Sequence, residues 1–280
     1  MTDRRQTPAN GRVAAAHLEG EVKADRFVTP QPAQVITFAV FLLARPDGPR
    51  DRQLLFGDIV DVYERRGGVA FVQSRKDGYC GYLDEAALGP VIPPTHAVRV
   101  RQTHIYPQAG MKAAPLMRLP FNARVSVSDD RSDWHAVNWH GGTGIVHRDH
   151  LRPVSAPLPD PAETAALFLG TPYLWAGNTG DGLDCSGLVQ AACLAAGIAC
   201  MGDSDQQART LGVPLGDNQP CQRNDVIFWA GHVALAEDAD TMIHATAFGM
   251  ITRREPIADA IARIEAGGDG PVTMRRRLFP

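Results

Sequence analysis

Hydrophobic and polar positions alternate in short runs along residues 34–153, and turns rich in Gly, Pro, Asp and Asn separate these runs. Alternation with a period of two is typical of half-buried strands. The runs also repeat, because residues 54–62 resemble residues 119–127 and residues 81–88 resemble residues 144–151, at an offset of 63–65 positions. Short strands repeated at this spacing predict two copies of one small β-barrel.

The pattern changes after residue 154. Residues 155–161 include three prolines, which predict an extended linker. Residues 162–169 and 185–196 have the pattern of helices, and Gly197 marks the end of the second one. Short apolar runs at 226–228, 232–236 and 242–245 predict strands. Helices followed by strands within one unit predict an α+β domain.

These patterns divide the chain into five expected segments. They are a partly ordered lead-in at 1–32, small barrels at 33–93 and 94–154, the linker at 155–161 and the α+β domain at 162–280. The composition is that of folded domains, because 44% of the residues are hydrophobic and only 21% are charged.

Net charge and apolar runs limit the partners. The net charge is −3, so a nucleic-acid partner is not expected, and the basic run Arg275–Arg277 is interpreted as a solvated tail. No run approaches the ~18 apolar residues that a membrane span needs, so no membrane partner is expected. No apolar segment follows the N-terminal arginines, which favours a cytoplasmic location. The five cysteines lack CxxC spacing, so reduced thiols are expected.

Cys185 is the strongest candidate nucleophile. It follows Asp184, a plausible N-cap residue, at the point where a turn leads into the second predicted helix. The first turn of a helix stabilises a thiolate through unpaired N–H groups and the helix dipole. A buried and inert thiol is the alternative, and it is the interpretation that we give to Cys193 and Cys200.

Two histidines are candidate partners for this thiol. His232 opens one predicted strand and His244 lies in the next, across a polar turn, so a hairpin would place both imidazoles on one face. One histidine would then serve as the general base and the other would orient it. A zinc site formed by Cys185, His232 and His244 is a weaker alternative, because the sequence has no closely spaced pair of ligands.

The segments around these residues resemble the NlpC-type, papain-like cysteine peptidases. The nucleophile segment matches at 171–177 and 182–190, the base segment at 224–235 and the third-residue segment at 242–245. Two departures are mild: Asn224 replaces a usual Gly, and Ala176 replaces one Gly of a Trp-Gly-Gly turn. The resemblance implies a papain-like peptidase domain, preceded here by two barrels that resemble bacterial SH3-like domains.

The resemblance also implies roles for four residues. Cys185 would attack the γ-carbonyl of D-glutamate in a cell-wall peptide, His232 would act as the base, and His244 would orient it. Tyr173, with the backbone N–H of Cys185, would stabilise the oxyanion. This chemistry needs neither a cofactor nor a metal.

The two barrels narrow the resemblance to γ-D-glutamyl-L-diamino acid endopeptidases of the dipeptidyl-peptidase VI type. In that group a barrel closes one end of the cleft, and acidic and tyrosine side chains hold the free α-amine of an N-terminal L-alanine. The matching positions here are Tyr79, Asp203 and Ser204, with Asp58 as a further carboxylate. Such selectivity implies the recycling of free murein peptides.

Two alternatives remain open. The first is a thiol amidase or acyltransferase that acts on another amide, and the second is a non-catalytic scaffold that binds cell-wall peptides. The sequence leaves open the identity of the diamino acid, the role of the second barrel and the oligomeric state.

Overall fold

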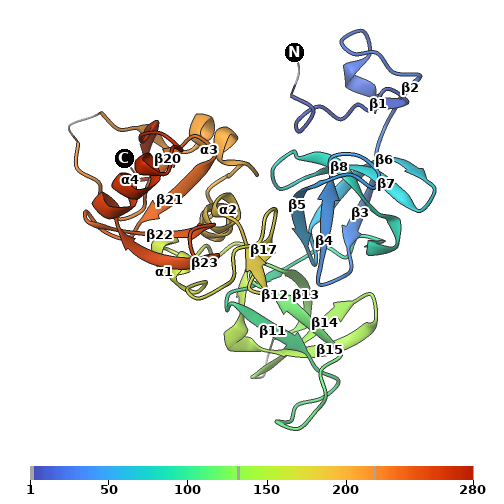
Figure 1. Cartoon of the computed structure of the whole chain (residues 1–280). Helices are drawn as coiled ribbons and strands as arrows, with labels where there is room; N and C mark the ends of the chain where they lie inside the picture. Colours follow the sequence, from blue (N-terminus) through green and yellow to red (C-terminus); the bar gives the residue numbers. More distant parts are fainter. Residues whose placement is uncertain (1–2, 131–132, 217–218, 280) are drawn as a thin grey trace. The chain divides into compact units, whose positions relative to one another are not determined.

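A computed structural model describes residues 3–130, 133–216 and 219–279 of the chain. The chain divides into two compact units, Met1–Ser155 and Ala156–Pro280 (Figure 1). The division falls after Ser155, where the predicted linker begins. Among the described residues, no helix is long and apolar enough to cross a bilayer.

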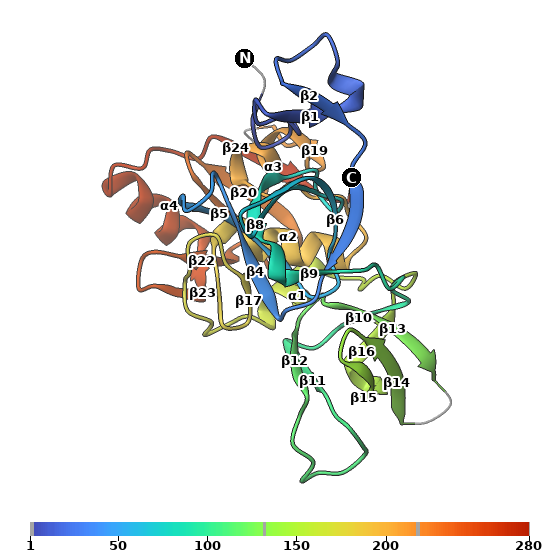
Figure 2. The ribbon, with the colours of Figure 1, turned by 90° about the vertical axis from the view of Figure 1, so that its right-hand side faces the viewer.

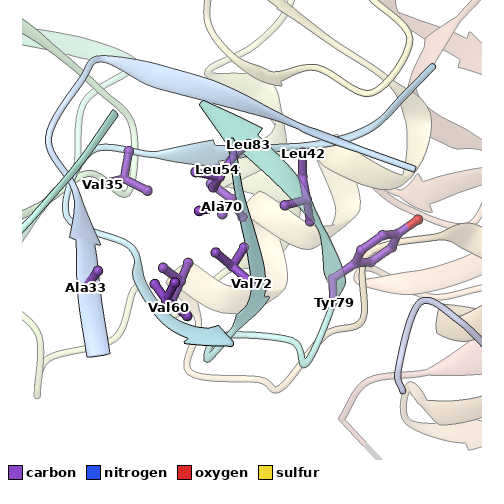
Figure 3. Close-up of a cluster of buried hydrophobic side chains, with 10 residues drawn as sticks. Ala33, Val35, Leu42, Leu54, Val60, Ala70, Val72, Tyr79 and Leu83 are labelled. Atoms are coloured by element: carbon purple, nitrogen blue, oxygen red, sulfur yellow. The ribbon is translucent and has the colours of Figure 1, made fainter. Parts of the chain in front are cut away.

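The first barrel of unit Met1–Ser155 is a seven-stranded sheet in the order β5-β4-β8-β7-β6-β3-β9. Its strands are β3 (Gln31–Val35), β4 (Ala39–Leu43), β5 (Arg50–Leu55), β6 (Ile59–Arg66), β7 (Val69–Ser74), β8 (Cys80–Asp84) and β9 (Leu88–Gly89), with the 3₁₀ turn η2 (Glu85–Ala87) before β9. A two-residue turn joins β6 to β7, and its residues Gly67 and Gly68 both have positive φ. Glycine favours this conformation, which matches the twist of a hairpin. Alternate side chains of the strands, including Val60 and Val72, form the core (Figure 3).

The N-terminal segment is more ordered than the sequence suggests. It forms β1 (Val13–Ala15), the 3₁₀ turn η1 (Ala16–Leu18) and β2 (Arg26–Val28), with β1 and β2 paired in parallel. Val13 packs with Tyr63 and Phe71 on the outside of the first barrel, in a separate apolar cluster. The apolar run Val13–Ala15 is too short to predict a strand by itself, and its order comes from this packing.

The second barrel contains a five-stranded sheet in the order β15-β14-β13-β10-β16. Its strands are β10 (His96–Val98), β13 (Arg124–Asp129), β14 (Trp134–Trp139), β15 (Gly142–His147) and β16 (Leu151–Pro153), with the 3₁₀ turn η3 (Arg148–His150) before β16. A separate hairpin pairs β11 (Gln102–Ile105) with β12 (Met117–Pro120), and its loop projects away from the barrel (Figure 2).

The two barrels share a structural detail at equivalent positions of the sequence repeat. The hairpin β6–β7 has a register shift between Val62 and Glu64, and the hairpin β13–β14 has one between Val127 and Asp129. These positions correspond in the sequence repeat. A bulge bends a strand and increases its twist, so the same bend recurs in both copies.

Unit Ala156–Pro280 combines helices with a six-stranded sheet in the order β19-β24-β20-β21-β22-β23. The strands of this sheet are β19 (Val213–Pro214), β20 (Asp225–Trp229), β21 (His232–Ala236), β22 (Thr241–Thr246), β23 (Ile251–Pro256) and β24 (Met274–Arg277). The helices are α1 (Pro161–Ala166), α2 (Cys185–Ala195), α3 (Ser204–Thr210) and α4 (Ile257–Ala266), and a short hairpin pairs β17 (Asn178–Thr179) with β18 (Gly182–Leu183). Helices α1 and α2 pack on β21 and β22, as Figure 1 shows. The predicted helices and strands of this unit are therefore confirmed.

The prediction of a solvated tail at Arg275–Arg277 is wrong. These residues belong to β24, which pairs with β20 and β19. Arg276 is buried and donates a hydrogen bond to the carbonyl oxygen of Leu211 at 2.8 Å, and Arg277 forms an ion pair with Asp225 at 2.9 Å. A charged run is compatible with a strand when carbonyl and carboxylate groups lie within reach of each guanidinium.

Candidate active site

The candidate nucleophile lies at the N-terminus of helix α2. Cys185 is the first helical residue, and Asp184 caps the helix by accepting hydrogen bonds from the Gly187 N–H at 2.6 Å and the Ser186 hydroxyl at 3.0 Å. The second carboxylate oxygen of Asp184 accepts the N–H of Ala176 at 2.9 Å. One buried carboxylate therefore fixes both the helix start and the preceding turn.

Close packing around Gly187 holds this turn against the helix. A Cβ atom at this position would lie 2.5 Å from the carbonyl oxygen of Gly177 and 2.5 Å from Oδ1 of Asn178. Both contacts are too short for any side chain, so only glycine fits. The backbone of α2 can therefore approach the turn that precedes Cys185.

The structure brings the two predicted histidines together. Nε2 of His232, the first residue of β21, lies 2.9 Å from Nδ1 of His244 in β22. His244 is fully buried, and its ring meets the ring of His232 nearly edge to face. Helix α2, which begins with Cys185, packs against both strands.

Sequence reasoning missed the next two members of this chain of contacts. Nε2 of His244 lies 3.0 Å from Oε2 of Glu255 in β23. Arg263 of α4 donates two hydrogen bonds to Glu255, at 3.0 Å and 2.7 Å. The pairing of β22 with β23 could have suggested Glu255, because Arg253 lies opposite His244 and Glu255 is its diagonal neighbour on the same face.

Burial dominates the protonation of these groups. Burial lowers the pKa of His244 to about 4, although the Glu255 carboxylate opposes this change. Burial and the neighbouring His244 lower the pKa of His232 to about 3. Burial and the nearby Cys185 raise the pKa of Tyr173 above its ordinary value, so this phenol keeps its proton.

Asp203 and Ser204 lie at the start of helix α3. Asp203 is the N-cap residue and forms a capping box with Gln206, and Ser204 is the first helical residue. The side-chain amide of Gln207 donates to the carbonyl oxygens of Ser186 at 2.9 Å and of Met201 at 3.0 Å. These bonds tie the start of α3 to the first turn of α2, beside Cys185.

Tyr79 and Asp58 belong to the other unit, in the first barrel. The ring of Tyr79 packs with the barrel core, and its hydroxyl points away from the cluster (Figure 3). Asp58 is buried, forms an ion pair with Lys76 at 2.6 Å and accepts the N–H of Leu55 at 2.9 Å. The Asp58 carboxylate thus has structural partners within its own barrel.

Comparison with known proteins gives consistent matches over both units. Residues 42–88 match the model of the bacterial dipeptidyl-peptidase SH3 domain, and residues 170–261 match the model of the NlpC/P60 family. A γ-D-glutamyl-L-lysine dipeptidyl-peptidase of Bacillus subtilis is 30% identical over 70% of this chain and 72% of its own length. The chain belongs to the NlpC/P60 family. A protein of the same name from Bacillus cereus is 38% identical over 70% of this chain and 67% of its own length.

One solved structure shows the same fold over most of the chain. An NlpC/P60 protein from Bacillus cereus covers 89% of this chain with a TM-score of 0.76 at 21% identity. The expected papain-like domain with an SH3 domain before it is therefore confirmed. The family and the relatives together show that the present chain is a cysteine peptidase.

The two departures from the family pattern have a common geometry. Ala176 and Asn224 both adopt positive φ, at 65° and 74°, in the conformation that glycine adopts most easily. Asn tolerates this conformation better than most residues, and Oδ1 of Asn224 also accepts the N–H of Ala162 at 2.8 Å, at the start of α1. Ala176 has no such intrinsic tolerance and is held by Asp184.

Proposed function

We propose that this peptidase hydrolyses the γ-D-glutamyl–L-diamino acid bond of murein peptides that begin with a free L-alanine. The proposal rests chiefly on one observation: Cys185 starts helix α2, which packs against the strands that carry the paired His232 and His244. The names of the Bacillus relatives support a γ-D-glutamyl substrate with a diamino acid on the far side of the bond.

The proposed reaction passes through an acyl-enzyme. The Cys185 thiol gives its proton to Nδ1 of His232, since Nε2 of that ring is engaged by His244. The thiolate adds to the γ-carbonyl, and the backbone N–H of Cys185 and the phenol of Tyr173 donate to the oxyanion. The C–N bond breaks as His232 returns the proton to the leaving amine, and water then hydrolyses the thioester with His232 as base.

Substrate selection is assigned to the start of α3. The carboxylate of Asp203 would accept a charge-assisted hydrogen bond from the substrate's ammonium group, with Ser204 beside it. The tether from Gln207 to Ser186 supports this role, because it keeps the start of α3 close to the nucleophile helix. Tyr79 and Asp58 are assigned to substrate binding by resemblance alone. An enzyme that reads a free amine would act on released peptides, so we also propose cytoplasmic recycling of cell-wall peptides.

The first experiment is a cleavage assay read by mass spectrometry. It compares L-Ala-γ-D-Glu-diaminopimelate, its L-lysine counterpart and the N-acetylated form of each, with Cys185→Ala as the inactive control. We expect cleavage of the free-amine peptides alone, and none by the variant. Equal cleavage of the acetylated peptides would support the peptidase activity but reject a site that recognises the free amine. No cleavage of any peptide would favour the amidase or scaffold alternatives.

The role of Asp203 can be tested with one variant and a matched control variant. Asp203→Asn removes the charge while leaving a good N-cap residue, so helix α3 keeps its start. Asp205→Asn removes a carboxylate two residues away that pairs with Arg209 on the exposed side of the helix. We expect Asp203→Asn to raise KM for free-amine peptides at least about tenfold, as loss of one charge-assisted bond does, and Asp205→Asn to leave KM unchanged.

A further inference from the structure

A continuous row of contacts leads away from His232 into the domain. His232 meets His244, His244 meets Glu255, and Glu255 accepts two hydrogen bonds from Arg263. The row draws on strands β21, β22 and β23 and on helix α4, and both His244 and Glu255 are buried. We infer that Glu255, held by Arg263, is a positioning residue that fixes the tautomers of both histidines. This inference rests on the proposed cysteine-peptidase mechanism.

The tautomers follow from the charge of Glu255. A carboxylate only accepts hydrogen bonds, so His244 must present its proton on Nε2. Neutral His244 then has a bare Nδ1, which can only accept, so His232 must donate from its own Nε2. The remaining nitrogen of His232, Nδ1, carries no proton. That nitrogen is the one that a general base needs in order to take the thiol proton.

Arg263 keeps Glu255 in the charged form. Burial acts to raise the pKa of Glu255, but the hydrogen bonds and charge of Arg263 outweigh it and lower the pKa. The guanidinium of Arg263 is itself positioned, because it lies 4.2 Å from the ring centroid of Phe248. Arg253 adds positive charge near both His244 and Glu255. Glu255 therefore remains an acceptor at neutral pH.

The same row assists the charged state of the reaction. When His232 takes the thiol proton it becomes an imidazolium, whose positive charge is stabilised through His244 by the carboxylate of Glu255. No proton needs to reach Glu255, because the chain acts through hydrogen bonds and charge. Loss of the carboxylate would thus remove both the tautomer preference and this stabilisation.

The first test measures the thiol and needs no substrate. Iodoacetamide labelling of Cys185 is followed by mass spectrometry from pH 5 to 9 in the wild type and in Glu255→Gln. The matched control is Glu237→Gln, because Glu237 forms a similar two-bond ion pair with Arg254 but touches neither histidine. We expect Glu255→Gln to shift the labelling profile by about one pH unit or more to higher pH, which is about tenfold in rate near pH 7.

The control variant should keep the wild-type profile. A Glu255→Gln profile equal to that of Glu237→Gln would overturn the inference. Peptide cleavage is measured separately, so a labelling shift without any cleavage would reject the proposed substrate and leave the positioning role standing.

The second test does not depend on the stability of the Glu255 variant. Histidine ring nitrogens are labelled with ¹⁵N in the Cys185→Ala protein at pH 7, and the tautomers are assigned by NMR, with His244→Gln to identify the signals. We expect His232 and His244 both as the Nε2–H tautomer. An Nδ1–H tautomer at either residue would refute the inference, whatever the variants do.

Discussion

Acid destabilises the peptidase unit through the buried histidine pair. His244 has a pKa of about 4 in the folded chain, against about 6.5 when it is unfolded, so below pH 6.5 the unfolded state binds the proton first. The stabilising contribution of neutral His244 is complete above pH 6.5 and is lost as the pH falls toward 4. The total is about 3 kcal/mol, of which about 2 kcal/mol is lost by pH 5. His232 acts in the same direction, since burial lowers its pKa as well.

The pH window and the reporter isolate this effect. Between pH 7 and 5 ordinary carboxylates stay ionised, and His232 and His244 are the two histidines of residues 156–280. Met242, fully buried in β22, reports unfolding of this unit through its oxidation by hydrogen peroxide across a urea series.

The expected result is a lower urea midpoint at pH 5 than at pH 7, by at least about 1 M, because His244 alone loses about 2 kcal/mol and His232 adds to this loss. The variant His244→Gln lacks one of the two titrating groups, so its midpoint should depend less on pH, whatever its stability at pH 7. A wild-type midpoint that is the same at both pH values would refute the reasoning. So would an equal pH dependence in His244→Gln.

Three further predictions concern the helix cap at Asp184, the positive φ of Asn224 and the reactivity of Cys185. Asp184→Ala should destabilise unit Ala156–Pro280 by about 2–4 kcal/mol, because it removes an N-cap and leaves the buried N–H of Ala176 unpaired. Asp160→Ala, which removes the N-cap of α1, should cost about 1 kcal/mol. Urea midpoints measure both changes. Asn224→Gly should lose only a hydrogen bond and Asn224→Ala also the φ tolerance, so the alanine variant should melt lower. Cys185 should alkylate with iodoacetamide well below pH 8 and before the other four cysteines; uniform slow labelling would contradict an activated thiol.

Short sequence patterns predict the parts of the site that lie within one helix or one hairpin. The start of α2 at Cys185 follows from Asp184 as N-cap, and the β21–β22 hairpin follows from two apolar runs around a polar turn. These features depend on residues that are close in sequence. The pairing of His232 with His244 is a consequence of that hairpin and was accessible for the same reason.

The positions of Glu255 and Arg263 depend on contacts between segments that no short sequence pattern predicts. Glu255 reaches His244 only because β23 pairs with β22 in one particular register, and Arg263 reaches Glu255 only because α4 follows β23. A shift of one residue in that register would turn Glu255 to the opposite face of the sheet. A charged residue in a strand followed by a helix is too common a pattern to identify such a pair.

The two carboxylates that the sequence analysis assigns to substrate binding, Asp58 and Asp203, differ in their surroundings. From the sequence, Asp58 is offered as a further substrate-binding carboxylate, yet this carboxylate is buried in an ion pair with Lys76 and a backbone hydrogen bond. Asp203, in contrast, is only partly buried at the start of α3, which is compatible with the proposed contact to a substrate ammonium group. Burial and pairing of the two carboxylates therefore favour Asp203 over Asp58 as the group that would bind the substrate amine.

The turn before the nucleophile holds strain that its neighbour must offset. Ala176 adopts a φ of 65°, which costs an L-residue with a Cβ about 1–2 kcal/mol relative to the right-handed conformation. A glycine at this position would remove that cost and would keep the backbone N–H that Asp184 accepts. With alanine, the carboxylate of Asp184 must hold the Ala176 N–H and the helix start together. Asp184 therefore couples the geometry of the turn to the position of Cys185. A substitution at Ala176 or at Asp184 should change the reactivity of the Cys185 thiol.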